Sequence, residues 1–217
     1  MWIKTRLAAF LLAITTWLSV NAFAQNSYDQ DFTPVTQTML NNPNPQDWLM
    51  WRGGYENWGY SPLSEINRDN VDELRLAWSW EFAPAAPGSN GMQVEPTVYD
   101  GVMYIRHSNE KYSAHDAATG DLIWQYARPL ASEVAGYETR LTVHRGRGVF
   151  IYEDKLISHA TDGMLFALDP RDGSLIWEVA MQDFRSGQQP SGAPVAFNGS
   201  LVVPYNCTAW TAPDPCH

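Results

Sequence analysis

The sequence predicts an all-β fold, a β-propeller of four-stranded antiparallel blades, and three observations support this prediction. A tight turn followed by a strand that ends in Trp occurs over residues 114–124 and again over residues 167–177, with equivalent positions 53 residues apart. Short apolar runs alternate with Gly, Asp and Asn turn signals, and helical patterns occur only near the N-terminus. A small unit repeated at a fixed period is typical of propellers, in which each blade packs against its neighbours.

The residue types of the repeated turn fit its expected geometry. Asp116 and Asp169 stand where the two turns begin, so that a carboxylate accepts hydrogen bonds from the backbone N–H groups ahead of it. Gly120 and Gly173 provide a positive φ without steric cost. Each copy is therefore expected to be a turn between two strands, the second of which returns Leu, Ile and Trp to the core.

A hairpin is expected ahead of each turn. The first spans residues 97–105 around an Asp-Gly turn, and the second spans residues 148–160, where Glu153 and Asp154 replace Asp-Gly. A third hairpin at residues 193–203 has an Asn-Gly turn. These units amount to about three blades, whereas propellers close with roughly 4–8. The chain is therefore expected to be part of a longer propeller.

The N-terminus is expected to be an export signal. Residues 1–24 combine two basic residues, a short apolar run and an Ala-x-Ala cleavage site, as secretory signal peptides do. An N-terminal membrane anchor is the alternative, although the run is short for a membrane span, and no later segment is apolar enough to be a transmembrane segment. Residues 25–46 form a polar segment with a short helix at 33–40, and residues 47–217 hold the propeller units.

Two more elements are expected before the first hairpin. A short helix is predicted at residues 71–74, with Asn67 or Asp69 as its N-terminal cap. Apolar residues alternate with small ones over residues 76–80, which is the two-residue period of a half-buried strand.

Charge and cysteine content exclude some functions. The formal net charge is −10, and an acidic surface argues against nucleic acid or anionic membranes as partners. The chain has two cysteines, Cys207 and Cys216, which in an exported protein form a disulfide more readily than they stay free thiols. Both alternatives stay open. A metal site at these cysteines is disfavoured because the five His are scattered, and no catalytic or metal-ligating residue is assigned.

The motifs together resemble one known family. Residues 114–124 carry the pattern A-x-D-x-x-T-G-D-x-x-W intact, and residues 167–177 depart from it at Asp172 and Ser174. Further matches are GYSPL at 59–63, the pattern IN-x-x-NV-x-x-L-x-x-AW at 66–78 and DGVMY at 100–104. The pattern is similar to the tryptophan-docking motif of the pyrroloquinoline-quinone (PQQ)-dependent alcohol dehydrogenases of the methanol and ethanol dehydrogenase type.

The resemblance implies an eight-bladed propeller in a periplasmic enzyme. It implies PQQ and a Ca²⁺ or lanthanide ion as cofactors, a small alcohol as substrate and a cytochrome c as electron acceptor. Quinone and cation would work together, because a Lewis acid polarises the quinone carbonyl that accepts hydride. The function implied is the N-terminal part of such a dehydrogenase. The alternative is a non-enzymatic exported propeller that acts as a protein-binding scaffold.

The resemblance also assigns three cofactor-binding residues, Arg147, Ser191 and Gln93. Arg147 aligns with an arginine that contacts the quinone, although a solvated basic loop is an equally open interpretation because Arg145 lies nearby. Ser191 stands in SGAP, where the family has a hydroxyl in T-x-A-P. Gln93 replaces a glutamate, and its amide is able to donate to a quinone carboxylate; Glu95 follows two residues later.

Two departures from the family pattern affect the reaction centre. The family's vicinal cysteine pair would fall at Leu141 and Thr142, and its metal-binding glutamate would fall near residues 208–210; neither is present. The catalytic aspartate and a metal-ligating asparagine of the family belong to later blades. The chain alone is therefore not expected to assemble the reaction centre.

Overall fold

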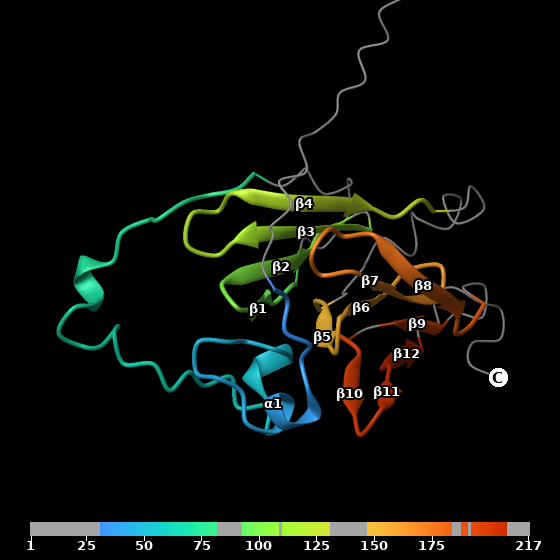
Figure 1. The fold of residues 1–217 in the computed structure, drawn as a ribbon, viewed down its shortest axis with the longest axis horizontal. Helices are drawn as coiled ribbons and strands as arrows, with labels where there is room; N and C mark the ends of the chain where they lie inside the picture. Colours follow the sequence, from blue (N-terminus) through green and yellow to red (C-terminus); the bar gives the residue numbers. More distant parts are fainter. Residues whose placement is uncertain are drawn as a thin grey trace, which may run out of the picture.

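The computed structural model describes residues 31–81, 93–108, 110–130, 147–183, 188–190 and 192–207, and these form antiparallel sheets with a few short helical turns (Figure 1). The helical elements are α1 (Gln37–Asn41) and the 3₁₀ helices η1 (Trp51–Gly53) and η2 (Val71–Glu73). The strands are β1 (Thr97–Tyr99), β2 (Val102–Arg106), β3 (Lys111–Asp116), β4 (Leu122–Ala127), β5 (Phe150–Tyr152), β6 (Lys155–His159), β7 (Met164–Leu168), β8 (Leu175–Ala180), β9 (Gln188–Pro190), β10 (Val195–Phe197), β11 (Ser200–Val202) and β12 (Tyr205–Cys207). The predicted all-β class is confirmed.

The strands form two complete four-stranded units and part of a third. The orders β1-β2-β3-β4 and β5-β6-β7-β8 follow the chain, and every neighbouring pair is antiparallel. Figure 1 shows these two sheets side by side, with β9 to β12 next to the second. The third unit has the β10–β11 hairpin and a separate β9–β12 pair. All three predicted hairpins are therefore formed.

The repeated turn has the same backbone hydrogen bond in both units, from the Gly120 N–H to the Asp116 carbonyl and from the Gly173 N–H to the Asp169 carbonyl, at 2.8 Å each. In each unit the register between the third and fourth strands shifts at the same repeat position, between Ala114 and His115 and between Ala167 and Leu168. The Asp116 carboxylate accepts the Ala118 and Thr119 N–H groups at 2.9 Å each, as predicted for a residue that begins a turn.

The Trp at the end of the first unit packs on the turn of the second unit. A Cβ added to Gly173, whose φ is +74°, would lie 2.5 Å from the Cε3 of Trp124. The Trp124 indole N–H donates to the Pro170 carbonyl at 2.8 Å. Glycine is therefore required here both for its backbone conformation and for the contact with the ring.

The predicted strand at residues 76–80 is wrong, although its central Trp packs in the same way. Residues 74–81 are not part of any sheet in the described chain, and Leu76 is 83% exposed. An extended segment with no partner strand leaves its backbone groups to water, so alternation alone does not make a strand. Trp78 nevertheless lies over Gly120 of the first unit, and its indole donates to the Ala117 carbonyl at 3.1 Å.

The N-terminal helical predictions are partly correct. The predicted helix at residues 33–40 is present as α1, but it begins later, after Thr36, whose hydroxyl accepts the Met39 N–H at 3.3 Å. The predicted helix at residues 71–74 is the 3₁₀ turn η2, and no side chain caps it. The Asn67 side chain instead accepts the Asp69 N–H at 2.9 Å, which closes a local turn.

The N-terminal segment connects all three units. Val35 forms a β-bridge to Glu153 in the β5–β6 turn, and Trp48 forms one to Val98 of β1. The Tyr55 hydroxyl donates to a β10 carbonyl at 2.5 Å. The main core lies between the sheets and includes the fully buried rings of Tyr112, Phe150 and Phe166.

Several predictions concern parts of the chain outside the described residues. These parts are the signal peptide at residues 1–24, Leu141, Thr142, Ser191, residues 208–210 and Cys216. Within the described residues, no helix combines the length and apolar character needed to cross a membrane.

Candidate functional site

The predicted site residues belong to segments that lead into the first strands of the units. We call residues 93–96, 147–149 and 192–194 the lead segments; they precede β1, β5 and β10. Because strand direction alternates within each antiparallel unit, the first two lead segments lie at the same end as the β2–β3 and β6–β7 turns. Gln93 and Arg147 therefore lie at one end of neighbouring units, and Ser191 directly precedes the third lead segment in the sequence.

The first and second lead segments are in direct contact. The Glu95 N–H donates to the Arg147 carbonyl at 3.3 Å, and the Thr97 hydroxyl donates to the Val149 carbonyl at 2.7 Å. A Cβ added to Gly148 would lie 2.8 Å from the Glu95 carbonyl oxygen, and the φ of Gly148 is +136°. Glycine therefore permits the close approach that brings the two segments together.

The Arg147 guanidinium lies over an aromatic ring and forms no ion pair with a described carboxylate. The Arg147 side chain is half-buried, and its Cζ lies 5.4 Å from the centre of the Trp51 ring, within cation–π range. No carboxylate of the described residues forms an ion pair with it. Gln93 is exposed at the same end. A guanidinium and an amide donor are the kind of groups that bind carboxylates.

Glu95 has a structural role in this arrangement. Its carboxylate accepts hydrogen bonds from the Trp48 indole and, at 2.7 Å, from the Arg52 backbone N–H. Arg52 has a φ of 57°, and its guanidinium donates to the Asn57 carbonyl at 3.0 Å. A groove of about 490 Å³ beside these contacts is lined by Trp48, Arg52, Gly59, Glu95, Pro96, Val98 and Met103. Glu95 thus anchors the N-terminal segment to the first lead segment.

The described residues do not supply a metal site. They contain no group of three or more His, Cys, Asp or Glu side chains able to hold an ion. A Ca²⁺ or lanthanide ion prefers several oxygen ligands, carboxylates above all. The arrangement at the lead segments therefore fits an anionic organic cofactor, and it does not by itself fit the cation.

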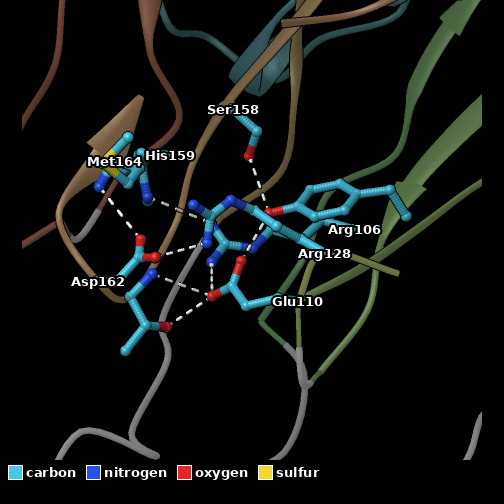
Figure 2. Close-up of polar contacts among 10 residues, drawn as sticks. Arg106, Glu110, Arg128, Ser158, His159, Asp162 and Met164 are labelled. Atoms are coloured by element: carbon cyan, nitrogen blue, oxygen red, sulfur yellow. Dashed lines mark hydrogen bonds and ion pairs between the residues drawn. The ribbon is translucent and has the colours of Figure 1, made fainter. Parts of the chain in front are cut away.

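Figure 2 shows a buried polar cluster at the same end, which the sequence did not reveal. The Glu110 carboxylate accepts from the Arg106 guanidinium at 3.1 Å, from the Thr161 N–H at 3.1 Å and from the Tyr112 hydroxyl at 2.9 Å. The other nitrogen of the Arg106 fork lies 3.3 Å from the Nδ1 of His159. These contacts join the β2–β3 turn of the first unit to the second unit.

A second ion group in Figure 2 joins the same two units. Arg128, just after β4, contacts Asp162 at 2.6 Å and Glu178 of β8 at 3.1 Å. The sequence holds one weak signal for the first cluster. Arg106 and His159 are separated by the 53-residue repeat, so they occupy equivalent positions in successive units.

Comparison with known proteins shows the family. Residues 48–197 match the PQQ family described as glucose/ethanol/alcohol dehydrogenase, beta-propeller domain. A quinone-type alcohol dehydrogenase subunit of Gluconobacter oxydans is 32% identical over 200 residues, which are 89% of this chain and 26% of the relative. The quinoprotein alcohol dehydrogenase PedH of Pseudomonas putida is 32% identical over 77% of this chain and 27% of its own length.

Solved structures agree. A quinohemoprotein alcohol dehydrogenase from Pseudomonas putida HK5 superposes with a TM-score of 0.66 at 28% identity, over 81% of this chain and 25% of that chain. A europium-containing methanol dehydrogenase gives a TM-score of 0.64 at 27% identity, over 79% of this chain and 29% of that chain.

The chain therefore belongs to the family of PQQ-dependent dehydrogenase β-propellers, as its motifs predicted. Its homologues are quinone-dependent and quinohemoprotein alcohol dehydrogenases. The chain spans about a quarter of the length of the curated relatives it matches.

Proposed function

We propose that this chain is the N-terminal part of a periplasmic quinone-dependent dehydrogenase that oxidises an alcohol and passes electrons to a cytochrome c. The observation that carries the proposal is the contact between the first two lead segments, which places Arg147 beside Glu95. Arg147 lies over the Trp51 ring and forms no ion pair with any carboxylate of the described residues. A relative at 34% identity is named 1-butanol dehydrogenase (cytochrome c), which supports the proposed acceptor. A small alcohol is the proposed substrate.

PQQ fits the donors of the lead segments because it is a planar tricarboxylate. Arg147 would bind one carboxylate through its planar fork, and Trp51 beneath it would limit the side chain's movement. The Gln93 amide and the Ser191 hydroxyl are the proposed neutral donors. When bound, the quinone supplies the electron acceptor for alcohol oxidation. The Ca²⁺ or lanthanide ion is proposed from the family alone, and its ligands are not among the described residues.

The test is quinone binding by the whole protein of which this chain is proposed to be the N-terminal part, measured by isothermal titration calorimetry with PQQ. We expect Arg147→Ala to weaken binding by about tenfold or more, because a charged, partly buried donor is lost. Arg147→Lys keeps the charge without the fork and should fall between the two. Arg75→Ala is the matched control, since Arg75 is exposed and its guanidinium donates only to local carbonyls. Equal affinities for the wild-type and Arg147→Ala chains would remove Arg147 from the site.

The second candidate is a non-enzymatic exported propeller that binds proteins. The specific observation in its favour is Leu141-Thr142 at the position of the family's vicinal cysteines. The same titration separates the two functions, because a scaffold has no reason to keep quinone affinity. A whole wild-type protein that does not bind PQQ would favour the scaffold.

A further inference from the structure

A line of buried polar contacts runs through all three units and ends at the third lead segment. Glu110 binds Arg106, Arg106 contacts the Nδ1 of His159, and the Nε2 of His159 contacts the Gly192 carbonyl. The side chains of this line are nearly inaccessible: Glu110 and His159 are each 1% exposed, and Arg106 is 4% exposed. Figure 2 shows Arg106 between the Glu110 carboxylate and the His159 ring.

The chemistry of the neighbours determines the protonation of the His159 ring. The Arg106 guanidinium only donates hydrogen bonds, so Nδ1 must accept. The Gly192 carbonyl only accepts, so Nε2 must carry the proton. A neutral imidazole with its proton on Nε2 satisfies both neighbours. Burial, together with the charge of Arg106, lowers the pKa of His159 to about 4, which agrees with a neutral ring at ordinary pH.

The contact falls on a backbone that lies close against another part of the chain. A Cβ added to Gly192 would lie 2.5 Å from the Cγ of Pro204, so this segment is packed against the chain that leaves β11. His159 ends β6 and therefore belongs to the second unit, whereas Gly192 leads into the third. Arg106 occupies the equivalent position one repeat earlier and also reaches forward, to His159. Residues at this repeat position thus connect each unit to the next.

We propose that His159 is a positioning residue that fixes the third lead segment at Gly192 relative to the second unit. The proposal rests on the proposed function in one respect: the lead segments are the parts of the chain assigned to the quinone. His159 itself does not touch the quinone in this scheme. The hydrogen bond that His159 donates to the Gly192 carbonyl holds the backbone next to Ser191. Arg106, which is itself held by Glu110, keeps the His159 ring in the required orientation.

Two substitutions of His159 in the same whole protein separate positioning from general stability. His159→Gln keeps one donor and one acceptor on a side chain of similar length, whereas His159→Leu keeps only volume. The matched control is His115→Leu. His115 is also a buried histidine, and its ring contacts the Gly120 carbonyl at 3.2 Å. That carbonyl lies in the turn between β3 and β4, within the first unit, and not in a lead segment.

The first readout is amide hydrogen exchange of the peptide that covers residues 192–197, compared with a β2–β3 peptide. We expect His159→Leu to raise exchange in residues 192–197 about tenfold or more, because a released segment opens more often. His159→Gln should stay within about threefold of wild type, and His115→Leu should not single out this peptide. Unchanged exchange in His159→Leu, or the same increase in His115→Leu, would overturn the positioning role.

The second readout is PQQ affinity, and the unfolding midpoint of each variant is measured beside it so that a loss of stability can be told from a loss of binding. His159→Leu should weaken PQQ binding about tenfold, and His159→Gln should restore most of the affinity. Affinity that falls equally in His115→Leu would show a stability effect only and would contradict the proposal. If the whole wild-type protein does not bind PQQ, the proposed function fails, and the hydrogen exchange result still decides whether His159 positions Gly192.

Discussion

The contribution of the contact between Trp124 and the Gly173 turn to the free energy of unfolding can be predicted. The chain contains a second glycine, Gly101, that has nearly the same φ but no such contact. Gly173 and Gly101 have nearly the same backbone conformation, with φ values of +74° and +75°. A Cβ at Gly173 would lie 2.5 Å from the Trp124 ring, whereas a Cβ at Gly101 would meet nothing within 4 Å. The pair Gly173→Ala and Gly101→Ala therefore separates backbone strain from loss of the docking contact.

The expected magnitudes follow from the two environments. Both alanines pay a conformational cost of about 1–2 kcal/mol for the left-handed backbone. Gly173→Ala should cost about 2–4 kcal/mol more, because it forces the ring of Trp124 away. That displacement costs about 1–3 kcal/mol of overpacking, and it loses the 2.8 Å hydrogen bond to Pro170, which contributes about 1 kcal/mol.

Urea unfolding followed by tryptophan fluorescence measures both variants. Gly173→Ala should lower the unfolding midpoint well below that of Gly101→Ala, and the emission of the folded state should shift to the red as Trp124 meets water. Equal free energies of unfolding for the two variants would refute the reasoning, since the docking contact would then add nothing to the backbone effect.

Three further predictions concern other parts of the structure. The stability of the chain should fall as the pH drops from about 6.5 toward 4, because unfolding frees His159 and His107, whose pKa values burial lowers to about 4, to bind protons, and His159→Gln should remove the His159 share of this slope in urea titrations at each pH. Arg128→Met should destabilise the fold by about 3 kcal/mol by leaving Asp162 nearly buried without its partner, and the double variant Arg128→Met with Asp162→Asn should recover part of the loss. Gly120→Ala should displace Trp78 and lower the urea unfolding midpoint below that of Gly101→Ala, and equal midpoints for the two variants would contradict the packing role of Trp78.

Much of the fold could be predicted because its signals are local. Asp116 and Gly120 encode a turn within a few residues, and the Asp-Gly and Asn-Gly pairs encode hairpins in the same way. The strand predicted at residues 76–80 failed because a strand needs a partner, which the alternation of Leu76 and Trp80 does not specify.

The site could be predicted only in outline. Family resemblance selected Gln93 and Arg147, and the structure places both at one end of neighbouring units. Family resemblance could not select Glu110 or His159, because the groups that they contact belong to another unit. Glu110 meets Thr161, and His159 meets Gly192, across sequence separations that no short motif covers.

The sequence by itself determined the all-β class, the repeated turns and the family, because these depend on local backbone preferences and on motifs in order along the chain. Only the tertiary structure decided that Trp124 docks on Gly173 of the following unit and that Arg106 and His159 lie in contact. The physical reason is that a turn is specified by its own residues, whereas a buried contact between units is specified by how the sheets pack.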